Sequence, residues 1–356
     1  MRICLATPAP PRSRTGNRVT ALRWSRILRA LGHPTRIVQQ YRGGPADLLV
    51  ALHARKSLPS MECFRRLHPD RPLVLALTGT DLYDDVRRDP AARAGLDWAW
   101  RLVVLQSAAL DELPPHLRPR ARVIYQSCPP RAGGRKVRGV FQACVVGHLR
   151  PVKDPFRAAR AARLVPSSSR LRVVQAGSPL LPEMAAEARA EEAANPRYRW
   201  LGGLPRGRVL ELLSRSHLLV LTSLMEGGAN VVCEALACGV PVLSSRISGS
   251  IGILGADYPG YFTPGDTQEL ARLLWRAESD PRWYEELGRW CQGLRHLVLP
   301  EREAASWRSL LDELSPGRPA AEASQEPPDR AAGPGPQAVQ GRRPSGREGP
   351  SSPGDR

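Results

Sequence analysis

The sequence predicts an α/β protein with two Rossmann-like, doubly wound domains that face a central cleft. Short apolar runs of strand length alternate with amphipathic helical stretches, a pattern typical of parallel sheets covered by helices on both faces. A segment rich in Pro, Gly and Arg at 128–139 interrupts this alternation, which then restarts. The 356 residues also exceed the length of about 250–300 at which a single hydrophobic core stops growing.

The first series of elements predicts an N-terminal domain over residues 1–138. Its expected strands are RICLAT, TRIVQQY, DLLVALHA, PLVLALTG, LVVLQS and RVIYQS. Between the first two strands, apolar residues recur with helical spacing from Ala21 to Leu31, and Gly32 follows them as a helix end. Strands that each precede a crossover helix favour a parallel sheet.

The second series predicts another such domain over 139–300. Its expected strands are VFQACVVG, LRVVQAGS, HLLVLTS and PVLSS, with helices beginning near Pro155, Pro182, Gly207 and Asn230. Two helices follow at 267–279 and about 282–314, and we expect the last part, 301–314, to pack on the core. Four tryptophans in these helices are the expected core anchors: Trp275, Trp283, Trp290 and Trp307.

Residues 315–356 are expected to form a disordered tail. Pro and Gly together occupy 16 of these 42 positions, and no apolar periodicity remains. Such a composition buries too little surface to offset the entropy lost on ordering.

Composition excludes several classes of protein. No apolar run approaches the about 20 residues needed to span a bilayer, so no membrane span is expected. The seven cysteines are scattered and form no C-x-x-C pair, which argues against a disulfide framework or a cysteine zinc site. We therefore expect a cytoplasmic protein with reduced thiols.

The positive charge is concentrated in the first domain. The net charge is +18, and 49 of the 52 basic residues are arginine. Residues 1–138 carry 25 basic and 10 acidic residues, whereas 139–314 carry 21 and 19. Nucleic acid, a small polyanionic substrate and a solvated Arg-rich surface each account for this distribution.

The segment LTSLMEGGANVVCEALACGVPVLSS, residues 221–245, combines a strand, a Gly-containing loop and a helix that opens near Asn230. Free backbone N–H groups and the positive end of the helix dipole suit a phosphate there. Gly227 and Gly228 have no Cβ to prevent close approach of the backbone. Glu234 lies one turn into the helix, where its carboxylate can accept hydrogen bonds from two ribose hydroxyls.

These residues resemble the signature of the family 4 glycosyltransferases, which have the GT-B fold. The matching positions are Ser223, Glu226, Gly227, Val231, Glu234, Ala235, Ala237, Gly239, Pro241 and Val242. The resemblance implies that Glu226 contacts the donor sugar and Glu234 the nucleotide ribose, with Gly228, Ala229 and Asn230 in the same donor loop.

A second stretch, VVGHLRPVKDPFRAAR at 145–160, resembles the strand–loop–helix that holds the donor diphosphate in that family. Lys153 matches the family's lysine and is one of only three lysines in the chain. His148 stands where the family usually has an arginine, and Arg150 follows two residues later. The resemblance leaves open whether His148 or Arg150 is the second cation that binds the diphosphate. Gly147 begins this loop.

No metal is expected at this site. The chain has no D-x-D motif, and Asp84–Asp85 is an adjacent pair at what we take for an exposed helix start. Charge on the leaving group would then be neutralised by Lys153, Arg150 and the helix N-terminus. Lys153, Glu226 and Arg150 are the expected catalytic residues, and no cofactor is implied.

Three loops of the first domain follow predicted strands and predict the acceptor site. Cationic residues and free amides gather at 12–18, and polar side chains follow the strands that end near residues 52 and 77. All three loops leave the carboxyl edge of the sheet, where ligands bind in such folds. The candidates are Arg14, Gly16, Asn17, Arg18, His53, Arg55, Thr80 and Asp81.

Together with the stretches TPAPP…GNRVTALRW, LVALHARKS, LTGTDLY and SRISGSIGILGADYPGYF, these motifs resemble the selenosugar synthases of selenoneine biosynthesis. The resemblance covers about residues 1–310. It implies transfer of N-acetylglucosamine or glucose from a UDP-sugar to selenophosphate, with loss of UDP and phosphate. A selenophosphate synthetase would supply the acceptor, and a selenoneine synthase would use the selenosugar.

Two other functions remain open from the sequence. A family 4 enzyme acting on a sugar, lipid or small-molecule hydroxyl would share the donor site, but the cationic 12–18 loop fits it poorly. A nucleic-acid-binding protein would use the basic first domain, but no binding module or interleaved aromatic residues accompany the charge, so no specific nucleic acid is expected. The preferred sugar and the inverting or retaining outcome are also open.

Overall fold

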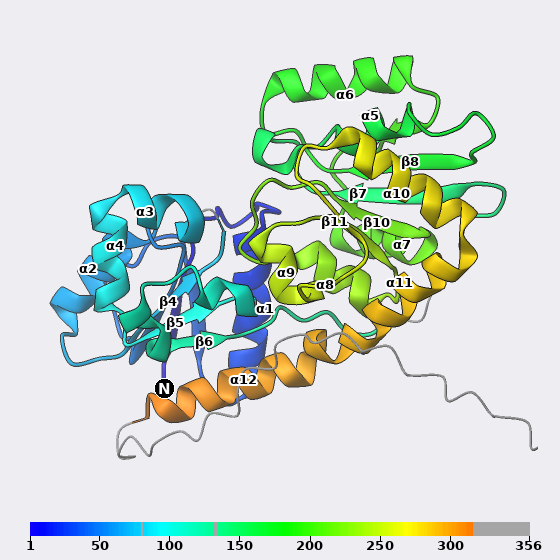
Figure 1. The fold of residues 1–356 in the computed structure, drawn as a ribbon. Coiled ribbons are helices and arrows are strands. Elements are labelled where there is room, and N and C mark those ends of the chain that lie inside the picture. The colour runs from blue at the N-terminus through cyan, green and yellow to red at the C-terminus, as the bar shows by residue number, and fades with distance from the viewer. Residues whose placement is uncertain (80, 132–133, 316–356) are drawn as a thin grey trace, which may run out of the picture.

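The computed structural model describes residues 1–79, 81–131 and 134–315. Figure 1 shows two lobes, each built on one sheet. The predicted tail at 315–356 lies outside the described residues except for Ser315, and the predicted acceptor residue Thr80 also lies outside them.

The N-terminal lobe is a parallel sheet buried on both faces. Its strand order is β2-β1-β3-β4-β5-β6. Alternate residues of β1 enter different cores: Ile3 and Leu5 face α1 and α12, whereas Cys4 and Ala6 face the side of α2 and α4. The strands are β1 (Ile3–Ala6), β2 (Thr35–Val38), β3 (Leu48–Leu52), β4 (Leu73–Leu77), β5 (Arg101–Val104) and β6 (Ala121–Val123). The helices are α1 (Gly16–Ala30), α2 (Leu58–Leu67), α3 (Val86–Arg88) and α4 (Pro90–Trp98).

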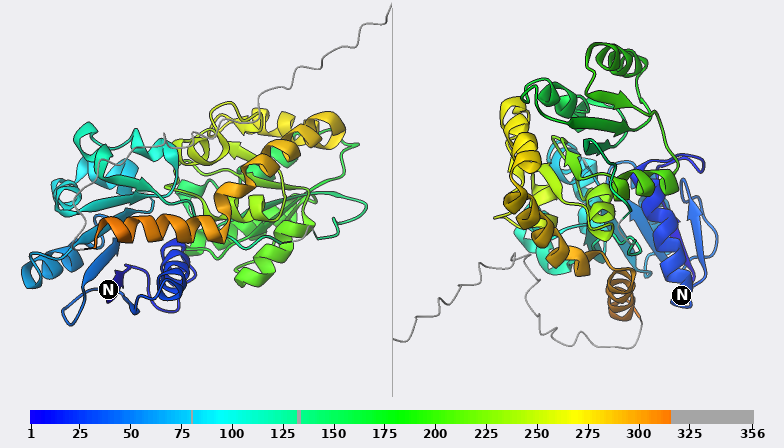
Figure 2. Two further views of the ribbon diagram at one scale, coloured as in Figure 1. Left: turned by 90° about the horizontal axis from the view of Figure 1, so that it is seen from below. Right: turned by 90° about the vertical axis from the view of Figure 1, so that its right-hand side faces the viewer.

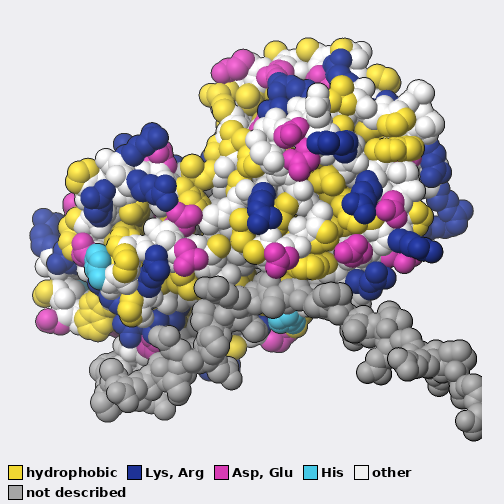
Figure 3. Space-filling view, viewed as in Figure 1, with side chains coloured by type: hydrophobic (Ala, Val, Ile, Leu, Met, Phe, Trp, Pro, Cys, Tyr) yellow, Lys and Arg dark blue, Asp and Glu magenta, His cyan; other side chains and the backbone are white. Residues whose placement is uncertain are grey.

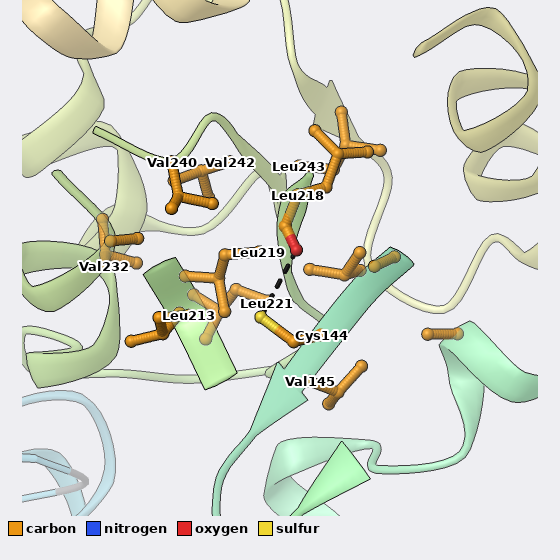
Figure 4. Close-up of a cluster of buried hydrophobic side chains, with 14 of the residues drawn as sticks. Cys144, Val145, Leu213, Leu218, Leu219, Leu221, Val232, Val240, Val242 and Leu243 are labelled. Carbon is orange, nitrogen blue, oxygen red and sulfur yellow. Dashed lines mark hydrogen bonds between the residues drawn. The ribbon is translucent and has the colours of Figure 1, made fainter. Parts of the chain in front are cut away.

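The C-terminal lobe is a second parallel sheet, with strand order β12-β11-β10-β7-β8-β9. Figure 4 shows its central core, where Cys144 donates from Sγ to the Leu218 carbonyl among aliphatic side chains. The strands are β7 (Phe141–Val146), β8 (Leu171–Ala176), β9 (Tyr198–Trp200), β10 (Leu218–Leu221), β11 (Val242–Ser245) and β12 (Tyr261–Phe262). The helices are α5 (Arg157–Ala162), α6 (Pro182–Ala194), α7 (Arg206–Arg215), α8 (Asn230–Ala237), α9 (Ser248–Leu254), α10 (Thr267–Ser279) and α11 (Pro281–Gly293).

The predicted fold class is confirmed by these two doubly wound sheets, but the predicted continuous helix over 282–314 is wrong. α11 ends at Gly293, a 3-10 segment spans Leu294–Val298, and α12 (Pro300–Glu313) begins at a proline. Proline has no backbone N–H to continue a helix, and its ring favours the first helical position. The break lets α12 leave the second lobe.

α12 returns the chain to the N-terminal lobe, as Figures 1 and 2 show. Trp307 on α12 is fully buried against Trp24 on α1, with ring centroids 4.8 Å apart in an edge-to-face arrangement. Trp283 is also buried, whereas Trp275 and Trp290 are partly buried. The C-terminal helix is therefore part of the N-terminal core.

A buried ionic network joins α1, α12 and the segment that follows β6. The Arg23 Nε donates to Glu303 at 2.9 Å, and both side chains are almost fully buried. Glu303 also accepts from the Trp24 indole at 2.8 Å and from the Ser127 backbone N–H at 2.9 Å. Four donors on one carboxylate, counting the Ser127 hydroxyl, compensate for the loss of its hydration.

The same guanidinium reaches the second lobe. Arg23 donates from Nη2 to Gln126 at 2.8 Å and from Nη1 to Asn230, the first residue of α8, at 3.0 Å. Gln126 in turn donates to the Gly228 carbonyl at 2.7 Å. The loop before α8 is thereby held against α1.

Among the helices of the described residues, none combines the length and the apolar composition of a membrane span.

Replacing Glu303 with Gln tests the network. Glu303→Gln keeps the shape but leaves the Arg23 charge buried without its counter-ion, so we expect a loss of about 3 kcal/mol in unfolding free energy. Urea unfolding followed by circular dichroism measures it. The control is Glu285→Gln, which breaks an exposed pair with Arg289 and should cost less than about 0.5 kcal/mol. Equal midpoints for the two variants would contradict the role assigned to Glu303.

Candidate active site

Each sheet has one point where the strand order reverses, and these points position the candidate site. In the N-terminal sheet the reversal lies between β1 and β3, and in the C-terminal sheet between β7 and β10. Crossover connections leave toward opposite faces at such a point, which opens a crevice at the carboxyl ends of the strands. The predicted acceptor loops at 12–18 and 53–55 follow β1 and β3. The predicted donor segments at 147–153 and 222–229 follow β7 and β10.

Lys153 and Glu226 meet at the C-terminal reversal point. The Lys153 Nζ contacts Glu226 Oε1, and the same oxygen accepts from the Ser223 hydroxyl at 2.7 Å. Thr222 donates to the Lys153 carbonyl at 2.9 Å, so the segment after β7 is tied to the end of β10. A small cavity lies here, lined among others by Gly147, Lys153 and Ser223. The side chains are 22% exposed for Lys153 and 10% for Glu226, so both remain within reach of the cleft.

Glu234 lies one turn into α8 and pairs with an arginine that no sequence motif indicates. Arg206, the first residue of α7, donates from Nε to Glu234 Oε1 at 3.0 Å. Burial raises the pKa of Glu234, and the neighbouring Arg206 and Arg23 oppose that rise. Arg206 is one of 49 arginines, and no spacing rule distinguishes it in the sequence.

The two glycines of the donor loop are required by contact between the lobes. A Cβ on Gly227 would lie 2.6 Å from the backbone nitrogen of Gly79, and one on Gly228 would lie 2.6 Å from the Cβ of Leu105. Ala229, buried, precedes α8, and the Asn230 side chain is directed to Arg23. The loop thus contacts the N-terminal lobe along its length.

His148 and Arg150 differ in their freedom to bind an anion. The His148 ring contacts the 12–18 loop, with Nε2 3.3 Å from the Arg14 carbonyl oxygen. The Arg150 guanidinium is half-buried and has no hydrogen-bond or ion-pair partner within the described part of the chain. Arg150 is therefore the freer cation of the two.

The 12–18 loop contains three arginines and lies against the second lobe. The Arg14 side chain is exposed, and Asn17 and Arg18 are half-buried at the start of α1. The Arg18 Nε is buried without a hydrogen-bond partner. Gly16 faces the second lobe, where a Cβ added to it would lie 3.7 Å from the side-chain amide nitrogen of Asn230. The structure thus places this loop opposite the donor segments.

His53 and Asp81 are buried, and Asp81 joins the loops that follow β3 and β4. Asp81 is fully buried and accepts from the backbone N–H groups of Gly79 at 2.7 Å and Ala54 at 3.0 Å. His53 is 4% exposed, has a φ of +79°, and lies with Nε2 3.7 Å from Asp85. Arg55 is largely exposed and also pairs with Asp85, at 3.5 Å.

The expectation of an exposed Asp84–Asp85 helix start is wrong for Asp85. Its side chain is 14% exposed because it lies in a π-helical turn, Asp81–Asp85, that folds back on His53 and Arg55. Three residues that connect the lobes were not among the predicted site residues: the Tyr83 hydroxyl accepts from the Gln106 side-chain amide at 3.1 Å and donates to the Ser248 hydroxyl at 3.5 Å. Burial raises the pKa of Tyr83 to about 12. Within the described ranges, no three or more His, Cys, Asp or Glu side chains are grouped to hold a metal ion.

The surface charge does not form a single nucleic-acid-binding face on the side shown in Figure 3. Lys and Arg side chains are scattered over both lobes there, with Asp and Glu between them. A protein that follows a phosphate backbone presents a contiguous basic stripe instead.

Comparisons with known proteins support a glycosyltransferase. Residues 131–291 match the family described as "Glycosyl transferases group 1". A D-inositol 3-phosphate glycosyltransferase of Thermobifida fusca is 29% identical over 111 residues, which are 31% of this chain and 24% of that protein. Glycosyltransferase 1 domain-containing protein 1 of Xenopus tropicalis is 26% identical over 293 residues, covering 74% of this chain and 85% of that one. The crystal structure of HepE from Anabaena in complex with UDP and glucose has a TM-score of 0.70 at 16% identity, covering 87% of this chain and 99% of that chain.

The structural likeness confirms the predicted GT-B fold. The chain aligns with only 22–25% of the length of the first three curated relatives. The segment that matches the family, residues 131–291, includes the C-terminal reversal point with Lys153, Glu226 and Glu234. Residues 131–291 of this GT-B fold are thus similar to the group 1 glycosyltransferase domain.

Titration of His53 gives a test of its buried position. Burial lowers the pKa of His53 below its ordinary value of 6.5, so the unfolded chain binds the proton more tightly than the folded one. This contribution to stability is therefore present above pH 6.5 and is lost as the pH falls from 6.5 through the lower pKa of the folded chain. His53→Asn tolerates a positive φ and cannot titrate, so its melting temperature should fall less between about pH 7 and 5. An unchanged pH slope relative to the parent protein would contradict this placement.

Proposed function

We propose that the protein is a glycosyltransferase that moves N-acetylglucosamine or glucose from its UDP donor to selenophosphate. The observation that carries the proposal is the meeting of Lys153, Glu226 and Ser223 at the C-terminal reversal point, opposite a cationic loop of the other lobe. The group 1 match covers the donor half, and the bound UDP and glucose of HepE support a UDP-sugar. The selenophosphate acceptor rests on the likeness of the N-terminal segments to selenosugar synthases.

Binding of the donor would separate side chains that contact each other in the structure. Lys153 contacts Glu226, and the diphosphate would take Lys153 together with Arg150, whose guanidinium has no partner among the described residues. Glu226 would then accept hydrogen bonds from sugar hydroxyls. Because these cations and the α8 N-terminus supply the positive charge, we propose that the reaction needs no metal.

The acceptor would bind at the N-terminal reversal point. Selenophosphate is a small anion, and the side chains of Arg14, Asn17 and Arg18 offer donors that have no partner among the described residues. Arg55 lies at the end of β3 on the same edge of the sheet. His53 and Asp81 would position these loops from below, because both are buried against backbone groups.

The reaction exchanges two bonds: carbon–selenium replaces carbon–oxygen at the sugar, and a phosphorus–oxygen bond to water replaces phosphorus–selenium, with a proton of that water passing to the selenium. The selenium of selenophosphate attacks the anomeric carbon, the bond from that carbon to the diphosphate oxygen breaks, and UDP leaves. Water then cleaves the selenium–phosphorus bond and releases phosphate and the 1-selenosugar. Because the selenium is already anionic, no general base is required, and positioning with charge neutralisation carries the rate. A selenophosphate synthetase and a selenoneine synthase are the proposed functional partners.

A phosphorylated hydroxyl acceptor is the second candidate. The cationic loop would hold its phosphate equally well, and the relative from Thermobifida fusca is named for inositol 3-phosphate. Such an acceptor needs a general base beside its hydroxyl, whereas selenophosphate does not.

The first experiment measures UDP release from UDP-N-acetylglucosamine and UDP-glucose under anaerobic conditions. We expect release to depend on selenophosphate and mass spectrometry to find a selenium-containing sugar. Inositol 3-phosphate and inorganic phosphate are the parallel acceptor arms. Release with inositol 3-phosphate alone would replace the acceptor assignment, and no turnover with any UDP-sugar from folded protein would overturn the enzyme assignment.

Two substitutions separate the donor and acceptor halves. Lys153→Gln removes charge from the leaving group, so we expect kcat to fall about 100-fold or more. Arg14→Gln should instead raise KM for selenophosphate by about tenfold, the size of one charged hydrogen bond. Arg160→Gln, which breaks an exposed pair with Glu187, is the control and should change neither constant. A purely KM effect of Lys153→Gln would remove it from catalysis.

A further inference from the structure

Arg206 and Glu234 form an ion pair between two helices of the donor lobe. Arg206 begins α7, and its Nε donates to only one oxygen of the carboxylate, Oε1, at 3.0 Å. The other oxygen, Oε2, accepts no hydrogen bond from any residue that the structure describes. The Glu234 side chain is 10% exposed, against 36% for Arg206. One carboxylate oxygen is thus held while the other is left for a ligand.

The surroundings of Glu234 disfavour its ionised form unless a cation is close. Burial raises the pKa of Glu234, and Arg206 opposes this rise more strongly than Arg23 of α1 does. The other titratable groups that face Glu234 are three thiols, which contribute no positive charge: Cys128 after β6, and Cys233 and Cys238 of the α8 segment. Arg23 is itself paired with Glu303 at 2.9 Å. Arg206 is therefore the cation committed to Glu234.

An ionised carboxylate and a neutral carboxyl recognise different groups. The ionised form accepts hydrogen bonds at both oxygens, whereas the protonated form has a donor in place of one acceptor site. Vicinal hydroxyls of a ribose are donors that a free carboxylate oxygen binds strongly, and a ligand without them leaves that buried oxygen unpaired.

We propose that Arg206 is a positioning residue for nucleotide selection, which holds Glu234 as a carboxylate with Oε2 free, so that the site takes a nucleoside diphosphate by its ribose hydroxyls. This inference rests on the proposed function, because it assigns the nucleotide to the donor lobe. Arg206 does not touch the reacting atoms; it acts through Glu234.

The test compares the affinity of UDP with that of 2′,3′-dideoxy-UDP by calorimetry, so that no turnover is needed. The parent protein should bind UDP about 10- to 100-fold more tightly, because one charged hydrogen-bond set is lost with the hydroxyls. Arg206→Met should reduce this ratio to within about threefold of unity at the lower of two pH values and restore part of it at the higher, because a buried carboxyl that has lost its cation ionises only as the pH rises. Taking the ratio at each pH cancels the titration of the nucleotide's own phosphate.

Two further variants keep the result specific to the pair. Arg206→Lys retains the charge and should retain most of the ratio at both pH values. Arg208→Met, on the same helix, breaks an exposed pair with Glu211 and should leave the ratio unchanged.

The outcomes separate this inference from the function on which it rests. Binding of UDP by the parent protein together with an unchanged ratio in Arg206→Met would overturn the role of Arg206 alone. An equal ratio loss in Arg206→Lys and Arg206→Met would also overturn it, because the charge would then be irrelevant. Failure of the folded parent protein to bind any uridine diphosphate would overturn the donor assignment and this inference with it.

Discussion

The buried pair of Arg23 and Glu303 fixes the relation between the two lobes, and the geometry of the cleft depends on it. A guanidinium offers five donors in a planar fork, and Arg23 distributes them among α12, the segment after β6 and the first residue of α8. Each partner comes from a different part of the chain. Since an unpaired buried charge is costly, the three elements must assemble together. The donor loop is therefore positioned from α1, the helix that begins at the cationic loop on the opposite side of the cleft.

Sequence periodicity predicted the fold because both sheets are parallel and buried on both faces. Such strands are short apolar runs, and the helices between them carry the helical spacing that residues 21–31 show. The missed strands, β9 and β12, are only three and two residues long, too short for a period to be read. The predicted helix over 282–314 failed at Pro300. Its apolar pattern persists through the 3-10 segment, because Leu294, Leu297 and Val298 pack on the same core.

In the candidate site, too, some residues could be predicted from the sequence and others could not. Lys153, Glu226 and Glu234 could be named because each lies in a short strand–loop–helix stretch that resembles a family motif. Arg206 and Arg23 could not, since each meets its partner across tens or hundreds of residues and arginine is everywhere in this chain. The sequence predicted close approach of the backbone at Gly227 and Gly228 but not their neighbours in the other lobe, Gly79 and Leu105, which lie where a Cβ would be. A sequence pattern identifies that space is needed but does not identify what fills it.

The pairing of the two donor-site glutamates has a consequence for how the proposed donor binds. Glu226 lies with Lys153 and Glu234 with Arg206, so the site already holds these charges as neutral pairs. An incoming diphosphate brings negative charge to Lys153 and frees an oxygen of Glu226 for the sugar, while Glu234 keeps Arg206 and has Oε2 to offer the ribose. The two glutamates differ because Glu226 shares its oxygen with a lysine, a compact charge that moves easily between partners, whereas Glu234 faces the rigid fork of an arginine. We therefore expect Lys153 and Glu226 to change partners when the donor binds, and Arg206 and Glu234 to stay paired.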